Sequence, residues 1–257
     1  MRPLATAIAL TASMIASGSI AGVAHASPFR VVIDAGHGGS NTGAPAVTGG
    51  AYEKRVTLAV ARALAGELRA RGVDVVMTRE RDEYLTLRER VRRANAAEPD
   101  CFISLHTNAS GDRSRRGIET WVLARDAAEV EARRAASHER DDVHALLTEL
   151  KLLDAARVSA ELAHAVQSEL VAATGSLDRG VRQYGYDVLA GVTAPAVLVE
   201  MGFLDHPIEG AALLEPAQQR RIAAALAAGI LRFADDVRSG QKLVMSASHA
   251  PPRRPTP

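Results

Sequence analysis

The sequence has one cysteine, almost no net charge and no long uninterrupted apolar run. A single cysteine, Cys101, excludes an internal disulfide, so the folded state must be stabilised by other means. Cys101 opens the apolar run 101–105, and we interpret it as a buried, inert thiol. The 31 Lys and Arg nearly balance the 30 Asp and Glu, and this pattern does not resemble a nucleic-acid-binding surface.

The most apolar stretch lies at the N-terminus and is diluted by Ser, Thr and Gly. It follows Arg2 and ends in Ala24-His25-Ala26, the small-residue pattern that precedes signal-peptidase cleavage. Its uninterrupted apolar part is shorter than the ~20 residues of a transmembrane helix. We therefore expect residues 1–26 to be a signal peptide and the mature, exported protein to begin at Ser27 without a membrane span. An uncleaved anchor is the alternative.

Short β-branched runs alternate with amphipathic segments over residues 27–240. This alternation predicts a single α/β domain whose mixed, mostly parallel sheet is flanked by helices on both faces. The expected strands are 30–34, 73–78, 101–105, 118–123, 186–190 and 196–199. The expected helices are 56–71, 86–97, 155–173 and 216–237. Residues 241–257 are rich in Ser, Pro and Arg, which predicts a disordered tail.

Residues 124–154 differ from the rest of the domain. They are rich in Glu, Arg, Ala and Asp, contain no Gly or Pro and give no strand signal. We expect them to form one or two surface helices inserted into the domain.

Two histidines and two glutamates lie next to predicted strand ends or a glycine-rich loop. His37 and His106 follow the first and third predicted strands, Glu53 follows a glycine-rich loop, and Glu200 follows the last strand. Side chains at such positions can meet at one edge of an α/β sheet. Two imidazoles and a carboxylate suit a catalytic Zn²⁺ that keeps one position for water, and Glu200 suits a general base. Taken singly, each residue could instead be structural, for example Glu53 as part of a surface ion pair with Lys54.

Beyond these four residues, the chain resembles the zinc-dependent N-acetylmuramoyl-L-alanine amidases of the Amidase_3 family over residues 30–237. The matching motifs, in order, are Asp34-Ala35-Gly36-His37-Gly38-Gly39, Glu53-Lys54, Thr78-Arg79 with Asp82, Arg92 to Asn95, Ser104-Leu105-His106-Thr107-Asn108, Gly117-Ile118-Glu119-Thr120 and Val199-Glu200-Met201-Gly202-Phe203-Leu204.

The resemblance assigns roles to the four residues. It implies that His37, Glu53 and His106 bind zinc and that Glu200 is catalytic. The implied reaction is hydrolysis, by zinc-activated water, of the amide between the lactyl group of N-acetylmuramic acid and L-alanine of the peptidoglycan stem peptide. Arg79 and Asn108 are expected either to orient the substrate or to support the sheet edge.

The resemblance is to the AmiA, AmiB and AmiC-like branch, and it also gives the insertion 124–154 a meaning. In that branch a helical insertion covers the zinc site until an activator protein of the LytM-domain type displaces it. We expect Glu139 to be the residue that occupies the open metal position, with Glu129 and Glu131 as further candidates. The simpler alternative is a solvated charged helix without a regulatory role.

These expectations describe a monomeric peptidoglycan hydrolase that acts in the periplasm or outside the cell. Two other functions remain open. A zinc peptidase that cuts within the stem peptide could use the same metal and base, since both reactions hydrolyse an amide. A non-catalytic peptidoglycan-binding module could keep the fold and lose the chemistry, although such a module is expected to lack a ligand or the base.

Overall fold

A six-stranded sheet organises the computed structural model, which describes residues 28–240. The predicted signal peptide and the predicted disordered tail lie outside the described residues. None of the helices between residues 28 and 240 combines the length and the hydropathy that a bilayer span requires.

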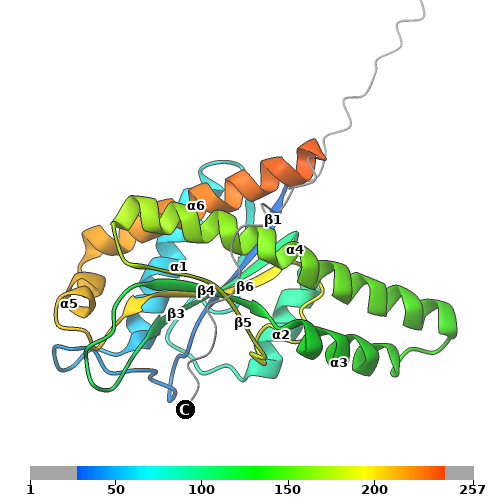
Figure 1. The fold of residues 1–257 in the computed structure, drawn as a ribbon, viewed down its shortest axis with the longest axis horizontal. Coiled ribbons are helices and arrows are strands. Elements are labelled where there is room, and N and C mark those ends of the chain that lie inside the picture. The colour runs from blue at the N-terminus through cyan, green and yellow to red at the C-terminus, as the bar shows by residue number, and fades with distance from the viewer. Residues whose placement is uncertain (1–27, 241–257) are drawn as a thin grey trace, which may run out of the picture.

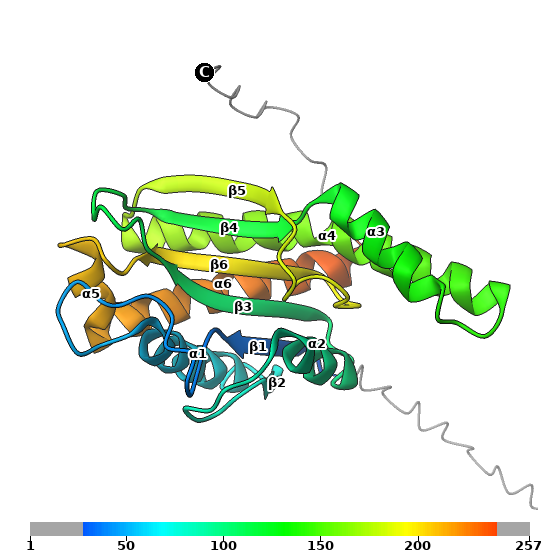
Figure 2. The ribbon, with the colours of Figure 1, turned by 90° about the horizontal axis from the view of Figure 1, so that it is seen from below.

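The sheet has the strand order β2-β1-β3-β6-β4-β5 (Figures 1 and 2). Its strands are β1 (Arg30–Ala35), β2 (Asp74–Met77), β3 (Cys101–Asn108), β4 (Ile118–Leu123), β5 (Asp178–Tyr184) and β6 (Ala196–Phe203). Strands β2, β1, β3 and β6 run parallel, β4 is antiparallel to β6, and β5 is parallel to β4. The predicted mixed, mostly parallel sheet is confirmed.

Helices cover the two faces of the sheet unequally. The helices are α1 (Glu53–Arg69), α2 (Leu87–Ala96), α3 (Arg125–Ala136), α4 (Asp142–Thr174), α5 (Glu209–Leu214) and α6 (Pro216–Ser239). Side chains alternate between the faces of a strand, so Val31 and Ile33 join the large core formed with α1, α4 and α6. Val32 points the other way, into a smaller core that includes Ala94 of α2 and the turn containing Val188.

The predicted insertion is a helical hairpin formed by α3 and the first part of α4, and it projects beyond the sheet (Figure 1). We call residues 125–154 the α3–α4 hairpin. The prediction that a separate helix begins at 155 was wrong, because α4 continues without a break from Asp142 to Thr174. Its start is fixed by Asp141, whose carboxylate accepts hydrogen bonds from the backbone N–H groups of Val143 and His144.

The fifth predicted strand, residues 186–190, was also wrong. This segment forms turns, and its apolar Val188 and Leu189 are buried in the smaller core. The actual strand, β5, lies earlier, at Asp178–Tyr184, on the edge of the sheet. None of its residues is buried, so it lacks the apolar pattern by which a strand is recognised in a sequence.

Candidate active site

Three of the four predicted residues form a tight cluster. One ligand atom from each of His37, Glu53 and His106 lies within 4.8 Å of those from the other two. The Nε2 atom of His37 is 3.0 Å from Oε2 of Glu53, and Nδ1 of His106 is 3.0 Å from Oε1 of the same carboxylate. The two imidazole rings meet edge to face at 4.8 Å between centroids. One glutamate therefore stands between two histidines.

These three side chains come from different kinds of element. His37 lies in the loop after β1, with a positive φ of 60°, and Glu53 is the first residue of α1. His106 lies inside β3, because that strand continues to Asn108 rather than ending at 105 as predicted. The sheet and the start of a helix thus fix the cluster from two sides.

Two glycines make room for the cluster. A Cβ atom on Gly36 would lie 2.5 Å from the imidazole of His106, and one on Gly43 would lie 2.5 Å from Oε2 of Glu53. Gly43 also has a φ of 67°, a conformation that residues with a Cβ adopt at an energetic cost. The glycine-rich loop is therefore required for the approach of the ligand side chains.

Hydrogen bonds from outside the cluster orient its members. Oε1 of Glu53 accepts from the backbone N–H of Thr107, and Oε2 accepts from that of Ala44, each at 2.9 Å. Nδ1 of His37 lies 2.9 Å from Oδ1 of Asn41, which directs Nε2 towards the cluster. Such outer contacts are usual around metal ligands, where they fix ring orientation.

The charges of the cluster are strongly coupled. Burial alone favours the neutral form of Glu53, but hydrogen bonds from His106 and His37 outweigh it and hold the pKa of Glu53 well below its usual range. Burial likewise acts to lower the pKa of His37, and the hydrogen bond and charge of Glu53 more than offset it, so that pKa is raised. The carboxylate is thus ionised, as a metal ligand must be.

The donor set fits a divalent metal ion. Two imidazole nitrogens and one carboxylate converge within 4.8 Å, and this combination is used by catalytic zinc sites that leave a further position open. Metal binding explains why an ionised carboxylate is buried between two histidines, whereas a purely structural core does not require such a group.

Glu200 lies beside this cluster on the neighbouring strand. It is in register with His106 across β3 and β6, and β6 continues past it to Phe203. Its Oε2 atom is buried and has no hydrogen-bond partner among the described residues. Burial, followed by the negative charges of Glu53 and Glu119, raises the pKa of Glu200 well above its usual value. A carboxyl group in this state can hold a proton and exchange it.

Arg79 does not face an open site. It is 1% exposed, and its guanidinium donates to the backbone carbonyls of Ala35, Gly36 and Lys54 at 2.8, 2.8 and 3.1 Å. Of its two predicted roles, these contacts favour support of the backbone that carries His37 over contact with a substrate.

A second arginine, Arg90, supports the same backbone and was missed in the sequence. It pairs with buried Asp34 at 2.7 Å and donates to the carbonyl of His37 at 2.6 Å. Asp34 also accepts from the hydroxyls of Thr78 and Ser104. The amphipathic pattern of α2 did not indicate that one of its arginines is buried and faces the sheet, because arginines on such a helix usually lie on the solvent-exposed face.

The second group missed by sequence reasoning surrounds Glu119. This glutamate is 3% exposed, lies on β4 in register with Glu200, and accepts from Nδ2 of Asn108 at 2.7 Å. It also lies 2.8 Å from Nε of Arg179 and 3.2 Å from Nε of Arg182. Glu119 could have been noticed in the sequence, because it is a charged residue inside the predicted strand 118–123. The arginines gave no such signal, because β5 was not recognised.

The structure does not bring Glu139 to the cluster. Glu139 lies in the turn between α3 and α4, is exposed, and accepts a hydrogen bond from the Thr148 hydroxyl at 3.0 Å. Glu129 and Glu131 form ion pairs with Arg125 and Arg134 of their own helix.

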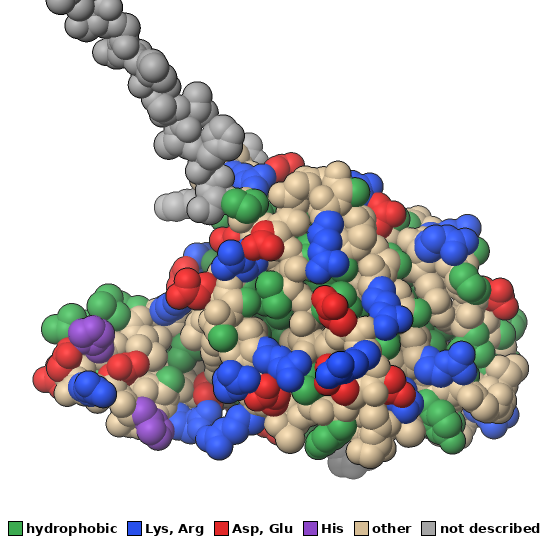
Figure 3. Space-filling model, turned by 180° about the vertical axis from the view of Figure 1, so that it is seen from behind, with side chains coloured by type: hydrophobic (Ala, Val, Ile, Leu, Met, Phe, Trp, Pro, Cys, Tyr) green, Lys and Arg blue, Asp and Glu red, His purple; other side chains and the backbone are tan. Residues whose placement is uncertain are grey.

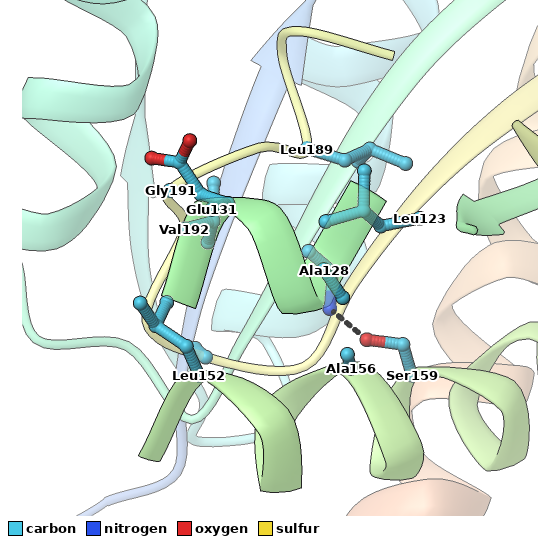
Figure 4. Close-up of a pocket in the computed structure, with 11 residues that line it drawn as sticks. Leu123, Ala128, Glu131, Leu152, Ala156, Ser159, Leu189, Gly191 and Val192 are labelled. Carbon is cyan, nitrogen blue, oxygen red and sulfur yellow. Dashed lines mark hydrogen bonds between the residues drawn. The ribbon is translucent and has the colours of Figure 1, made fainter. Parts of the chain in front are cut away.

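The position of the hairpin explains this. Because β4 runs antiparallel to β6, α3 begins at the end of the sheet opposite to the arrowheads of β1 and β6 (Figure 2). Figure 4 shows the base of the hairpin, where Ala128 and Leu152 line a small pocket with Leu123, and the Ser159 hydroxyl accepts from the backbone N–H of Ala196 at 2.8 Å. The hairpin is thus anchored where β6 begins, four residues before Glu200.

A further histidine, His206, lies in the turn between β6 and α5. Its Nδ1 atom accepts from the backbone N–H of Glu209 at 3.1 Å, at the start of α5. It takes no part in the cluster of His37, Glu53 and His106.

Comparison with known proteins gives consistent matches over the described domain. A family model, Amidase_3 (N-acetylmuramoyl-L-alanine amidase), matches residues 31–232. The uncharacterized protein YqiI of Bacillus subtilis (strain 168) is 33% identical over 205 residues, covering 80% of this chain and 84% of that protein. N-acetylmuramoyl-L-alanine amidase AmiA of Escherichia coli (strain K12) is 30% identical, with 79% of this chain and 75% of AmiA covered.

Other relatives are longer than this chain. N-acetylmuramoyl-L-alanine amidase AmiC of Neisseria meningitidis is 30% identical, and this chain spans about half of its length (52%). Among solved structures, the N-acetylmuramoyl-L-alanine amidase of Clostridium difficile 630 aligns with a TM-score of 0.67 and 30% identity, covering 82% of this chain and 98% of that one.

Proposed function

Because the chain belongs to the Amidase_3 family of N-acetylmuramoyl-L-alanine amidases, we propose that it is a zinc-dependent peptidoglycan hydrolase. The bond it cleaves joins the lactyl group of N-acetylmuramic acid to L-alanine of the stem peptide. The observation that carries this proposal is the cluster of His37, Glu53 and His106 beside Glu200, whose Oε2 atom is buried and has no partner among residues 28–240.

His37, Glu53 and His106 are the residues that would hold the zinc ion. When bound in a site of this kind, zinc supplies a water whose pKa is lowered to about 7 and a positive charge that polarises the substrate carbonyl. Asn41 and the backbone N–H groups of residues 44 and 107 keep the ligand side chains in place.

Glu200 is the proposed general base and acid. It accepts a proton from the attacking water as the new C–O bond forms at the lactyl carbonyl carbon. It then donates this proton to the leaving nitrogen as the C–N bond breaks, giving a lactyl carboxylate and a free L-alanine amine. The raised pKa of Glu200 supports this role, because a base that returns its proton must be able to hold it.

Digestion of purified peptidoglycan with the zinc-loaded protein tests the reaction, with products identified by mass. We expect release of intact stem peptides that begin with L-alanine. Fragments cut within the stem peptide would instead identify a zinc peptidase, and binding without any release would identify a non-catalytic module.

Outside the active site, we propose that the protein acts in the periplasm or outside the cell, where peptidoglycan lies, and that it belongs with the AmiA, AmiB and AmiC-like enzymes. The similarity to AmiA and AmiC supports this placement. A protein partner has a precedent, since a solved structure of the CwlD amidase from Clostridioides difficile holds it in complex with the GerS lipoprotein.

We propose the α3–α4 hairpin as the surface on which an activator of the LytM-domain type acts. Exposed apolar side chains support this: Val130, Val143, Leu146, Leu147 and Leu150 are each more than half exposed. Hydrophobic side chains and histidines are visible on the projecting end of the molecule in Figure 3. Blocking of the metal position by Glu139 requires a second arrangement of the hairpin, with its tip moved to the opposite end of the sheet.

A further inference from the structure

We propose that Arg179 and Arg182 on the edge strand β5 bind a carboxylate of the substrate's peptide, two or three residues from the bond that is cleaved. This inference rests on the proposed function, because it takes the stem peptide as the substrate and the metal cluster as the place of cleavage. It assigns substrate recognition to an edge strand outside the metal cluster.

The two arginines lie in line with the catalytic residues across the sheet. His106, Glu200 and Glu119 are in register on β3, β6 and β4, and their side chains share one face. Arg179 and Arg182 lie on the next strand, β5, where both contact Glu119, and Arg182 is in register with Trp121, two residues beyond Glu119. A substrate lying across this face reaches from the metal cluster to the arginines.

Glu119 holds both arginines by one nitrogen each. Nε of Arg179 and Nε of Arg182 contact the same oxygen, Oε2, of Glu119, at 2.8 and 3.2 Å. Among the described residues, the terminal Nη atoms of these two guanidinium groups have no hydrogen-bond partner. Each Nη carries two N–H donors, so the pair presents several donors to an incoming oxygen.

Aromatic rings restrict how the two guanidinium groups can turn. The Cζ atom of Arg179 lies 5.2 Å from the centre of the Phe203 ring, and that of Arg182 lies 5.6 Å from the centre of the Trp121 ring. Trp121 is itself packed edge to face against Tyr186 at 5.5 Å. Guanidinium groups held in this way are preorganised to bind a planar carboxylate.

The local charge favours an anion. Two guanidinium charges share one buried carboxylate, Glu119, whose other oxygen is taken by the amide of Asn108. The side chains of Arg179 and Arg182 are 21% and 44% exposed, so they are accessible to a ligand. An additional carboxylate would balance the remaining positive charge through charge-assisted hydrogen bonds.

The distance from Glu200 to β5 and the positions of free carboxylates in the substrate favour the stem peptide over the glycan as the ligand of the two arginines. β5 lies two strands from β6, which at about 4.8 Å per strand places it about 10 Å from Glu200. An extended peptide covers that distance in about three residues, at roughly 3.3–3.6 Å each. The glycan offers no free carboxylate next to the scissile bond, because the lactyl carboxyl is bound in the amide itself. The carboxylates at this range belong to the second and third residues of the stem peptide.

Muropeptides that differ in one carboxylate test the proposal. We would compare substrates with a free carboxylate and with a carboxamide, first at the second and then at the third peptide residue. The wild-type protein should prefer one free carboxylate by about tenfold or more in kcat/KM, the scale of a charge-assisted hydrogen bond. Arg182→Gln should lose this preference through KM with little change in kcat, and Arg182→Lys should keep part of it.

Arg232→Gln is the matched control, because Arg232 on α6 is 47% exposed and pairs with Glu169 at 3.1 Å, outside every proposed site, and it should keep the full preference. Binding of the free stem peptide is measured in parallel by calorimetry, with the wild-type protein and Arg182→Gln, since this readout needs no turnover. Equal cleavage of all substrates, with equal peptide binding by both proteins, would overturn the arginine site and leave the proposed function intact. Absence of cleavage of every substrate would refute the proposed function, and the binding measurement would still decide whether the arginines hold a peptide carboxylate.

Discussion

Glu53 and Glu200 of the candidate site are the same residue type, but their different environments suit them to different roles. Glu53 receives hydrogen bonds from two histidines and two backbone N–H groups, and its pKa is held low. Glu200, on the adjacent strand, has a buried oxygen without a partner in the described part of the chain, and its pKa is raised by burial and by neighbouring carboxylates. A pair of carboxyl groups whose pKa values are driven apart suits one metal ligand and one proton carrier.

Replacement of Glu200 by Gln separates proton transfer from metal binding. The amide keeps the size of the side chain but cannot accept the proton, so we expect kcat to fall by about 10²- to 10⁴-fold. Metal content, measured by mass spectrometry, should stay at the wild-type level. Glu67→Gln, a surface residue paired with Arg71, is the control. Turnover near the wild-type rate in Glu200→Gln would remove the role assigned to Glu200.

Replacement of Gly36 by Ala tests the packing of the cluster. The added Cβ would lie 2.5 Å from the imidazole of His106, so the ring must move and metal affinity should fall. Gly66→Ala is the control, because nothing lies within 4 Å of its Cβ position in the interior of α1. That change should stabilise the fold by about 0.5–1 kcal/mol. Unchanged metal affinity in Gly36→Ala would show that the ring does not hold this position.

At the scale of elements, the sequence predicted buried elements better than exposed ones. Strand β4 was predicted with the bounds it has, 118–123, and α6 was predicted to start at Pro216. Both place apolar side chains in the large core, so their periodicity is visible in the sequence. The edge strand β5 was missed because it is polar and unburied, and the two arginines that contact Glu119 were missed with it.

Spatial relations between distant elements could not be read from the sequence either. Residue types and glycines indicated His37, Glu53 and His106, and the fold brings them together. The antiparallel direction of β4 places the α3–α4 hairpin at the far end of the sheet, and no local pattern in residues 118–136 encodes that direction.

Shortening the hairpin tests its proposed regulatory role. Replacement of residues 134–145 by a short Gly-Ser turn removes Glu139 and no buried side chain, so cooperative thermal unfolding should be retained. If the hairpin is autoinhibitory, basal release of stem peptides should increase. Glu139→Gln is the companion variant that distinguishes the carboxylate from the hairpin as a whole. Unchanged basal activity in a folded, shortened protein would remove the autoinhibition proposal.

At the scale of the whole molecule, the site joins segments that are far apart in the chain. Glu53 begins α1, His106 lies in β3 and Glu200 lies in β6, and each element packs in the large core. The described part of the chain has one cysteine, which is buried and unpaired. A metal bound by His37, Glu53 and His106 would therefore link three segments that no disulfide connects.

Metal removal should consequently lower stability as well as activity. A ligand present at a thousandfold excess over its Kd stabilises the folded state by about 4 kcal/mol. We expect chelation to abolish peptide release and to lower Tm, and added Zn²⁺ to restore both. His37→Ala should have a low Tm that no longer responds to Zn²⁺. A Tm that is the same with chelator and with Zn²⁺ would argue against a metal at this cluster.

Isotope labelling during hydrolysis would test the proposed reaction at the bond itself. Purified peptidoglycan is digested by the zinc-loaded protein in water enriched in oxygen-18, and the products are analysed by mass. We predict one heavy oxygen in the lactyl carboxylate of the glycan product, together with unlabelled stem peptides that begin with a free L-alanine amine. Label in a peptide carboxylate, or no label and no release from the folded, zinc-loaded protein, would contradict the proposed amidase function.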